Sequence, residues 1–173
     1  MIIKSGNLEM VLNKDSDVTL RDLACKPEVA KFLTEKWTYP EGMPHALEFT
    51  IYHEDTLIGH AELKSIRWFN RKAEVGLFLD PQWQGRGMGF EAMQALVTHA
   101  FDHLNLHRLE AEVIEYNKPA LRLVENLGFV NEGLLREARY YNGKYFNILS
   151  YGLLRREFAA LKNRKEKNEF TDR

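Results

Sequence analysis

Residues 80–92, DPQWQGRGMGFEA, constrain this chain more than any other stretch because glycines occupy alternate positions there, at Gly85, Gly87 and Gly89. Glycine has no Cβ, so its main-chain N–H group can approach an anion closely. The first turn of a following helix adds unpaired N–H groups and the positive end of the helix dipole. Arg86 adds a side-chain charge to the loop. The segment therefore predicts a phosphate-binding loop.

The residues on either side of this loop have the periodicity of a strand and of a helix. Residues 74–79 (EVGLFL) place Val75, Leu77 and Leu79 on one face, which is typical of a strand. After the loop, apolar residues recur at helical spacing as far as Leu104 and predict a helix that begins near Met88. Strand, glycine loop and helix thus follow one another in the order that a phosphate site requires.

Two other interpretations of the glycines are open. Gly87, Gly89 and Ala92 also fit the dinucleotide-binding pattern G-x-G-x-x-G/A, with Glu110 and Glu112 about 20 residues further on. Such a fold usually begins with that motif and continues into parallel strand and helix units, whereas here half of the chain precedes the loop. The third interpretation is a plain structural turn. We favour the phosphate-binding loop.

The whole chain predicts one mixed α/β domain around a single central sheet. Strands are expected over residues 8–12, 46–53, 56–68, 74–79 and 108–115 and on both sides of Asn142-Gly143, and helices over residues 18–36 with a restart near Pro27, from Met88, and after Asn117. Residues 37–44 are expected to form a loop. We assign residues 1–160 to the domain and expect the charged residues 161–173 to fray.

Composition narrows the class of function. The chain has 173 residues, 45% of them hydrophobic, which suits one domain with a sizeable core. Its 24 basic and 25 acidic residues give a formal net charge of -1 and no electrostatic basis for general nucleic-acid or membrane-surface binding. The lone Cys25 cannot form an internal disulfide, and no apolar run approaches the ~20 residues of a membrane span. We expect a cytoplasmic protein, and no residue pattern predicts a metal site.

Residues 84–89 (QGRGMG) resemble the Q/R-x-x-G-x-G/A motif of the GCN5-related N-acetyltransferase (GNAT) superfamily. Residues 117–120 (NKPA) and 125–129 (ENLGF) are similar to a second block of that family. Residues 132–136 and 153–157 are similar to the branch that contains ribosomal-protein N-terminal acetyltransferases and spermidine acetyltransferases. The resemblance implies an acetyl-CoA-dependent N-acetyltransferase with direct transfer in a ternary complex. It also implies a mostly antiparallel sheet of about six or seven strands, splayed at the cofactor groove.

The resemblance assigns cofactor contacts to individual residues. It implies that the main chain of Leu77, Phe78 and Leu79 pairs with the pantetheine arm of acetyl-CoA as an extra strand would. The other implied contacts are the pyrophosphate loop, Gln84, Gly85, Arg86, Gly87, Met88, Gly89 and Phe90, and the residues near the pantetheine and nucleotide end, Asn117, Lys118 and Arg122. Asn117 is also the expected N-cap of a helix, and both roles can hold together. CoA is the implied product.

Acetylation needs a base because amines are mostly protonated at neutral pH, with reference pKa values of about 10.4 for a lysine-type amine and about 8 for an α-amino group. Glu112 is the first candidate, since it lies five residues before Asn117, where some N-terminal acetyltransferases of the family carry their catalytic glutamate. Glu74, at the start of the cofactor strand, is the second. Either glutamate can instead be an ordinary surface or ion-paired residue.

The acid that protonates the leaving thiolate is not evident. Many relatives place a tyrosine seven residues after the motif asparagine, and here that position is Val124. Ala120 stands where some relatives have serine. Tyr116 or Tyr151 is a substitute, or the thiolate leaves unaided, because a thiol pKa of about 8.5 makes it a fair leaving group. These departures leave open a second hypothesis, a CoA-binding regulatory protein without turnover.

The acceptor is least constrained. Aromatic and charged residues lie near the expected hairpin tip and in the loop before the sheet: Arg139, Tyr140, Tyr141, Lys144 and Tyr145, then Trp37, Tyr39 and Glu41. Such loops wall the acceptor pocket in this family. A polyamine needs several acidic groups, and apart from Glu41, Glu48 and Glu74 this half of the chain offers no acidic cluster. We therefore expect a protein or peptide N-terminal amine, with a small amine (polyamine or amino sugar) as the alternative. Family habit also suggests a homodimer.

Overall fold

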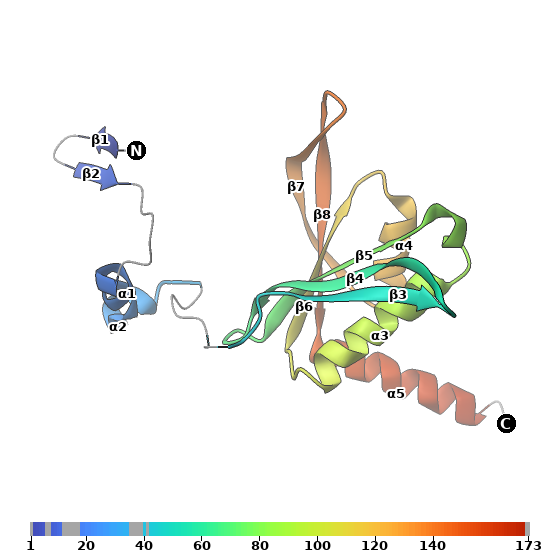
Figure 1. Ribbon diagram of the computed structural model, residues 1–173. Helices are drawn as coiled ribbons and strands as arrows, with labels where there is room; N and C mark the ends of the chain where they lie inside the picture. The colour runs from blue at the N-terminus through green and yellow to red at the C-terminus, as the bar shows by residue number, and fades with distance from the viewer. Residues whose placement is uncertain (1, 6–7, 12–17, 35–39, 41, 172–173) are drawn as a thin grey trace. The chain divides into compact units, whose positions relative to one another are not determined.

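The computed structural model describes residues 2–5, 8–11, 18–34, 40 and 42–171, and the chain divides into two compact units, Met1–Met43 and Pro44–Arg173 (Figure 1). In the first unit, β1 (Ile2–Ser5) pairs antiparallel with β2 (Leu8–Val11). The strand expected over residues 8–12 is therefore present, but it pairs in a separate two-stranded sheet. Of the loop expected over residues 37–44, residues 40 and 42–44 are described and belong to no helix or strand, and the other four lie outside the described residues.

The helical segment of the first unit is interrupted as the sequence predicts. Helix α1 covers Val18–Cys25, and α2 covers Pro27–Ala30. The break lies at Lys26, whose extended conformation (ψ 135°) is the one that a following proline favours. Pro27 then occupies the first turn of α2, where its missing N–H group costs nothing. Helix α2 is much shorter than expected.

The second unit contains one six-stranded sheet in the order β3-β4-β5-β6-β8-β7. Its strands are β3 (Leu47–His53), β4 (Thr56–Arg67), β5 (Lys72–Leu79), β6 (Arg108–Ile114), β7 (Val130–Tyr141) and β8 (Lys144–Leu154). All neighbours are antiparallel except β5 and β6. The predicted mixed α/β fold, with a mostly antiparallel sheet, is confirmed.

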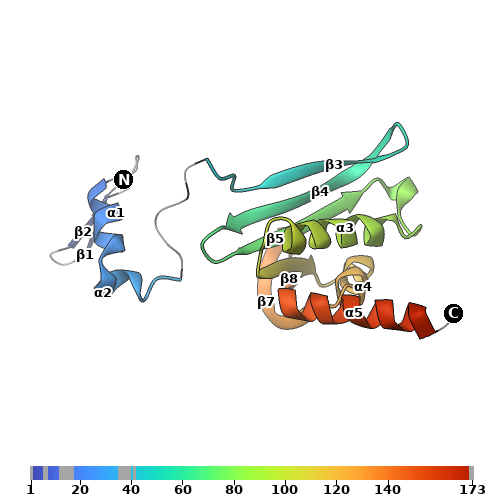
Figure 2. The ribbon, with the colours of Figure 1, turned by 90° about the horizontal axis from the view of Figure 1, so that it is seen from below.

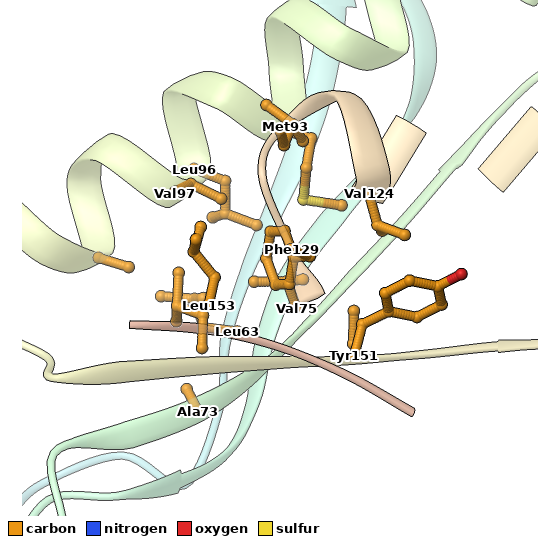
Figure 3. Packing of buried hydrophobic residues seen from close by; sticks show 14 of the residues in the cluster. Leu63, Ala73, Val75, Met93, Leu96, Val97, Val124, Phe129, Tyr151 and Leu153 are labelled. Atoms are coloured by element: carbon orange, nitrogen blue, oxygen red, sulfur yellow. The ribbon is translucent and has the colours of Figure 1, made fainter. Parts of the chain in front are cut away.

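Helices α3 (Met88–Asp102), α4 (Lys118–Asn126) and α5 (Arg155–Thr171) lie on the same face of this sheet (Figure 2). The core fills the space between them and the strands (Figure 3). Alternate residues of the strands point into it, for example Leu63 of β4 and Val75 of β5. The other residues of the same strands, including His60, Glu62 and Lys64 of β4, therefore share the opposite face. That face carries the charged side chains of the candidate site.

The ends of the elements match their local sequences. The Asn142-Gly143 turn has positive φ at both residues (49° and 79°), as a two-residue hairpin needs, and confirms the predicted hairpin. Asn117 is the N-cap of α4, because its Oδ1 accepts a hydrogen bond from the N–H group of Ala120 (3.2 Å). Helix α5 continues through the expected boundary at residue 160 to Thr171, where we expected a frayed tail. Its first turn is held by the Glu157 carboxylate, which accepts the N–H group of Leu154 (2.9 Å).

No helix in the described ranges is both long and apolar enough to cross a bilayer.

Gly128, which follows α4, provides a stability test. Its φ is +89°, and a Cβ there would overlap Cδ1 of Leu161 on α5. We expect Gly128→Ala to lower the free energy of unfolding by about 1–3 kcal/mol, since left-handed backbone strain and overpacking act together. Urea denaturation measures the change. Gly133→Ala is the control, because Gly133 has ordinary φ and no atom within 4 Å of an added Cβ. Equal losses in both variants would contradict the explanation.

Candidate active site

The parallel strands β5 and β6 separate soon after they meet. Their pairing covers Lys72–Glu74 with Arg108–Glu110 only, and beyond it the strands diverge (Figure 1). The N–H group of Asp80 donates to the carbonyl of Ile58 on β4 (2.8 Å), so the even-numbered residues of β5 bond to β4. Val75, Leu77 and Leu79 therefore direct their main-chain groups toward the side of β6. Past Glu74 no ladder partner from β6 meets them in the described part of the chain.

The three residues expected to bind pantetheine thus differ in role. Leu77 and Leu79 lie on the free edge, although the Leu79 carbonyl accepts a hydrogen bond from Nε2 of Gln84 (2.9 Å). Phe78 bonds to β4 through its main chain, opposite His60. Its exposed ring stacks on the His60 ring with centroids 5.4 Å apart. Val75, which we did not predict as a site residue, lies on the same free edge as Leu77.

The glycine loop connects β5 to α3 through the short helix η1 (Pro81–Trp83). Gly85 and Gly87 have φ of +73° and +83°, a conformation that residues with a Cβ rarely adopt, and no atom lies within 4 Å of an added Cβ at either. Gly87 is the N-cap of the 15-residue helix α3 and provides no side-chain cap. The first-turn N–H groups of Met88 and Gly89 therefore remain available to an anion.

Arg86 is exposed and its guanidinium lies over the ring of Trp83. Its guanidinium carbon lies 5.2 Å from the Trp83 ring centroid, and the Trp83 ring also lies against the His53 ring, with centroids 4.8 Å apart. The Trp83 Nε1 atom is buried and has no hydrogen-bond partner among the described residues. A free strand edge, an open glycine cradle, a helix N-terminus and an orphaned donor together fit a long polar ligand that carries a diphosphate, such as acetyl-CoA.

The residues expected near the nucleotide end lie at the start of α4. Asn117 uses Oδ1 to cap the helix, which confirms the predicted N-cap and leaves its amide NH₂ group without a described partner. Lys118 turns back, and its Nζ donates to the Glu115 carbonyl (3.0 Å). Arg122 is exposed on α4. Contact of these residues with a cofactor stays a prediction.

The two candidate bases lie on one face of the sheet at the point where the strands separate. Glu74 is opposite Glu110, the last pair between β5 and β6, and Glu112 lies two residues further along β6. Glu74 is ion-paired, with Oε1 3.0 Å from Nζ of Lys64. The Glu112 side chain is exposed and makes no hydrogen bond or ion pair with the described residues. The pKa of Lys64 is raised, first by its hydrogen bond to Glu74 and further by the negative charges of Glu62 and Glu112.

Glu110 is committed to a structural network. Its carboxylate pairs with Lys72 (3.3 Å) and with Nε of Arg108 (2.8 Å). Arg108 also makes a bidentate pair with Glu132 of β7, which raises the pKa of the guanidinium and lowers the pKa of the Glu132 carboxyl. These bonds connect β5, β6 and β7 at the end of the sheet where β5 and β6 are still paired.

Sequence reasoning missed Glu62. Its carboxylate lies over Gly76 of β5, where an added Cβ would come within 2.6 Å of Oε1. It lies 3.9 Å from both Lys64 and His60. The alternation of β4 places His60, Glu62 and Lys64 on one face, and that pattern was a usable signal.

Tyr151 does not lie on the face of the sheet that carries the two carboxylates. Tyr151 is 1% exposed and belongs to the core face, where its hydroxyl donates to Oε1 of Glu125 (2.9 Å) (Figure 3). Burial raises the pKa of this hydroxyl, and the bond to Glu125 raises it further. Tyr116 is half exposed and packs edge-on against Phe146 at 4.9 Å. Val124 is buried in the core, so α4 presents no hydroxyl at the position where relatives carry tyrosine.

Comparison with known proteins identifies a family with this kind of site. The family model of the acetyltransferase (GNAT) domain matches residues 8–130. The chain is 34% identical to the uncharacterized N-acetyltransferase p20 of Bacillus licheniformis, over 69% of this chain and 67% of the relative. It is 30% identical to the putative ribosomal N-acetyltransferase YdaF of Bacillus subtilis, over 68% and 64%. It is 33% identical to the spermidine N(1)-acetyltransferase of Vibrio cholerae, over 65% and 64%.

Solved structures give the same result. The spermidine/spermine N-acetyltransferase SpeG of Vibrio cholerae superposes with a TM-score of 0.64 at 30% identity, over 67% of this chain and 69% of that chain. Another structure of the Vibrio cholerae spermidine N-acetyltransferase is dodecameric. The matches span only about two thirds of the relatives, 64% of the length of two of them. The family match favours the phosphate loop over the dinucleotide alternative. The chain therefore belongs to the GNAT acetyltransferase family, whose members are N-acetyltransferases that use acetyl-CoA as the acyl donor.

Proposed function

We propose that the protein transfers an acetyl group from acetyl-CoA to the α-amino group of a protein or peptide N-terminus. The observation that carries the proposal is the separation of β5 and β6, which frees the edge of β5 beside a glycine cradle and two carboxylates. Acetyl-CoA supplies the acetyl group as an activated thioester. Residues of the chain bind and orient the two substrates and remove the proton from the amine.

The free edge and the loop bind and orient the donor in this proposal. Main-chain groups of Val75 and Leu77 bind an extended arm without side-chain chemistry. The N–H groups at the start of α3 and the Arg86 guanidinium bind the diphosphate. Glu112 then takes the proton from the acceptor ammonium, directly or through a water, because its carboxylate is not occupied by a cation.

Charge pairing on the sheet face favours a single amine over a polycation. Glu74 is paired with Lys64, Glu110 with Lys72 and Arg108, and Glu132 with Arg108. These pairs neutralise most of the acidic groups around the strand separation. A single ammonium needs one free carboxylate, whereas a polyamine needs several.

A polyamine is the alternative acceptor, and one observation favours it. Glu48 of β3 lies opposite Glu62 of β4, so both carboxylates share the face that carries Glu112. Relatives named spermidine acetyltransferases are consistent with it. A CoA-binding protein without turnover is the remaining alternative, suggested by Val124 and Ala120 at positions where relatives carry hydroxyl groups.

The test compares acceptors under one condition. We expect peptides with free N-termini to give kcat/KM values at least tenfold above that of spermidine, as measured by thiol release and by mass spectrometry of the product. The same peptides with a blocked N-terminus are the control and should give only slow hydrolysis. Higher kcat/KM with spermidine would reverse the acceptor assignment. CoA binding without turnover of any amine would indicate the regulatory alternative.

A further inference from the structure

The β7–β8 hairpin extends past the end of β6. Pairing between β6 and β8 ends at Ile114 and Ile148, while the hairpin continues to the turn at Asn142-Gly143 (Figure 1). The outer part of the hairpin therefore has no neighbouring strand from the sheet to hold its direction. Its aromatic and basic residues have to be placed by contacts near its root.

Strand β7 has an irregularity near the point where the hairpin extends past β6, here called the root of the hairpin. Leu135 pairs with Ile148 and Arg139 pairs with Phe146, so residues 136–138 lie opposite the single residue Asn147. Glu137, in this bulge, has a φ of 52°, which is unfavourable for a residue with a Cβ. A bulge removes ladder hydrogen bonds and bends the strand, so another group has to fix the bend.

The side chains of Asn147 and Glu115 fix the bend in β7. Oδ1 of Asn147 accepts the N–H group of Glu137 (2.9 Å), which replaces the lost ladder bond. The Glu115 carboxylate accepts both the N–H group of Asn147 (2.8 Å) and its Nδ2 (3.0 Å). The Glu115 N–H group donates to the Asn147 carbonyl (3.1 Å). One side-chain pair thus connects the end of β6 to both strands of the hairpin.

The same pair is connected to the candidate site. Glu115 lies three residues after Glu112 on the chain and two before Asn117, and its carbonyl accepts Nζ of Lys118. The next contact along the two strands, Tyr116 against Phe146, extends the connection. The bent hairpin is thereby fixed to the strand that carries the candidate base.

We propose that Glu115 and Asn147 are positioning residues that set the place of the β7–β8 hairpin as a wall of the acceptor site, and so determine affinity for the acceptor. This inference rests on the proposed function. The pair acts through the hairpin, and neither residue takes part in proton or acetyl transfer.

The bond pattern makes single substitutions informative. In Glu115→Gln, one carboxylate oxygen becomes an NH₂ group. If the new NH₂ group at position 115 faces Nδ2 of Asn147, two hydrogen-bond donors face each other. If the Asn147 amide flips to avoid this, the NH₂ group of Asn147 faces the N–H group of Glu137, and two donors again face each other. One bond is lost in either arrangement. We expect the KM for the acceptor to rise about tenfold, while the KM for acetyl-CoA and kcat change less than about twofold.

A second substitution should restore the pattern. In Glu115→Gln combined with Asn147→Asp, the Gln NH₂ group donates to the new carboxylate, which still accepts the N–H of Glu137. We expect the double variant to recover an acceptor KM within about threefold of the original protein. Glu137→Gln is the control and should change nothing, because Glu137 contributes only its main-chain N–H group.

Hydrogen exchange across residues 134–141 provides a readout that is independent of activity. We expect faster exchange in Glu115→Gln and recovery in the double variant. Unchanged exchange, an unchanged acceptor KM, or failure of the double variant to recover would each overturn the inference. A failure of the proposed function would give a different result. The unmodified protein would then acetylate no amine, while hydrogen exchange would still show whether the Glu115–Asn147 pair fixes the hairpin.

Discussion

Replacing Gly87 by alanine should raise the Kd for CoA by about 10- to 100-fold while leaving the fold intact. The expected loss corresponds to one or two charge-assisted hydrogen bonds of about 1.5 kcal/mol each. An added Cβ at Gly87 meets no protein atom within 4 Å, so the change does not disturb packing. It places a methyl group where the proposed diphosphate approaches the first turn of α3. Isothermal titration with CoA measures the effect.

Gly143→Ala is the matched control for this substitution. Gly143 has a φ of +79°, close to the +83° of Gly87, and likewise has no atom within 4 Å of an added Cβ. Both variants should therefore lose a similar amount of stability, about 1 kcal/mol, from left-handed backbone strain. Only the change at Gly87 should weaken CoA binding. Equal Kd values for the two variants would mean that the diphosphate does not lie at this loop.

The local parts of this site were predictable from the sequence because they depend on short-range rules. Alternating glycines before an amphipathic stretch predicted the loop and the start of α3, and Asn117 was correctly expected as a helix cap. The Asn142-Gly143 hairpin follows from turn chemistry alone. In each case the deciding residues lie within a few positions of one another.

The contacts between strands were not predictable in the same way. The ion pair of Lys64 with Glu74 depends on the register of β4 against β5, and a register shift follows directly after Lys64. A one-residue slip would place these side chains on opposite faces. The bond from the N–H group of Glu137 to the Asn147 side chain depends on a bulge in β7, which no local pattern predicts. Helix α5 continued past the expected boundary because its residues are mostly good helix formers, which we had read only as charged.

Glu112→Gln should lower kcat by about 10²- to 10⁴-fold, the usual contribution of a general base, with little change in the Kd for CoA. Glutamine keeps the shape of the side chain and removes its ability to take a proton. Glu112 is exposed and makes no ion pair or hydrogen bond with the described residues, so the substitution breaks no described bond and stability should hold. Thiol release under saturating substrates gives kcat, and titration gives the Kd.

The effect of pH separates a base from a residue that only binds the acceptor. An α-amino group has a reference pKa of about 8, so an increasing fraction of it is neutral as the pH rises toward about 9 and needs no base. The deficit of Glu112→Gln should therefore shrink as the pH rises from about 6 to about 9. A constant deficit across this range would indicate a binding role instead.

Glu74→Gln completes the comparison because Glu74 lies on the same face but is held by Lys64 at 3.0 Å. Protonation of Glu74 would break this ion pair, whereas protonation of Glu112 breaks no described bond. We expect Glu74→Gln to lower kcat by less than about tenfold, with a deficit that does not vary with pH. If Glu74→Gln instead showed the large, pH-dependent loss and Glu112→Gln kept full activity, the base would be Glu74, and its ion pair with Lys64 would have to open during each turnover.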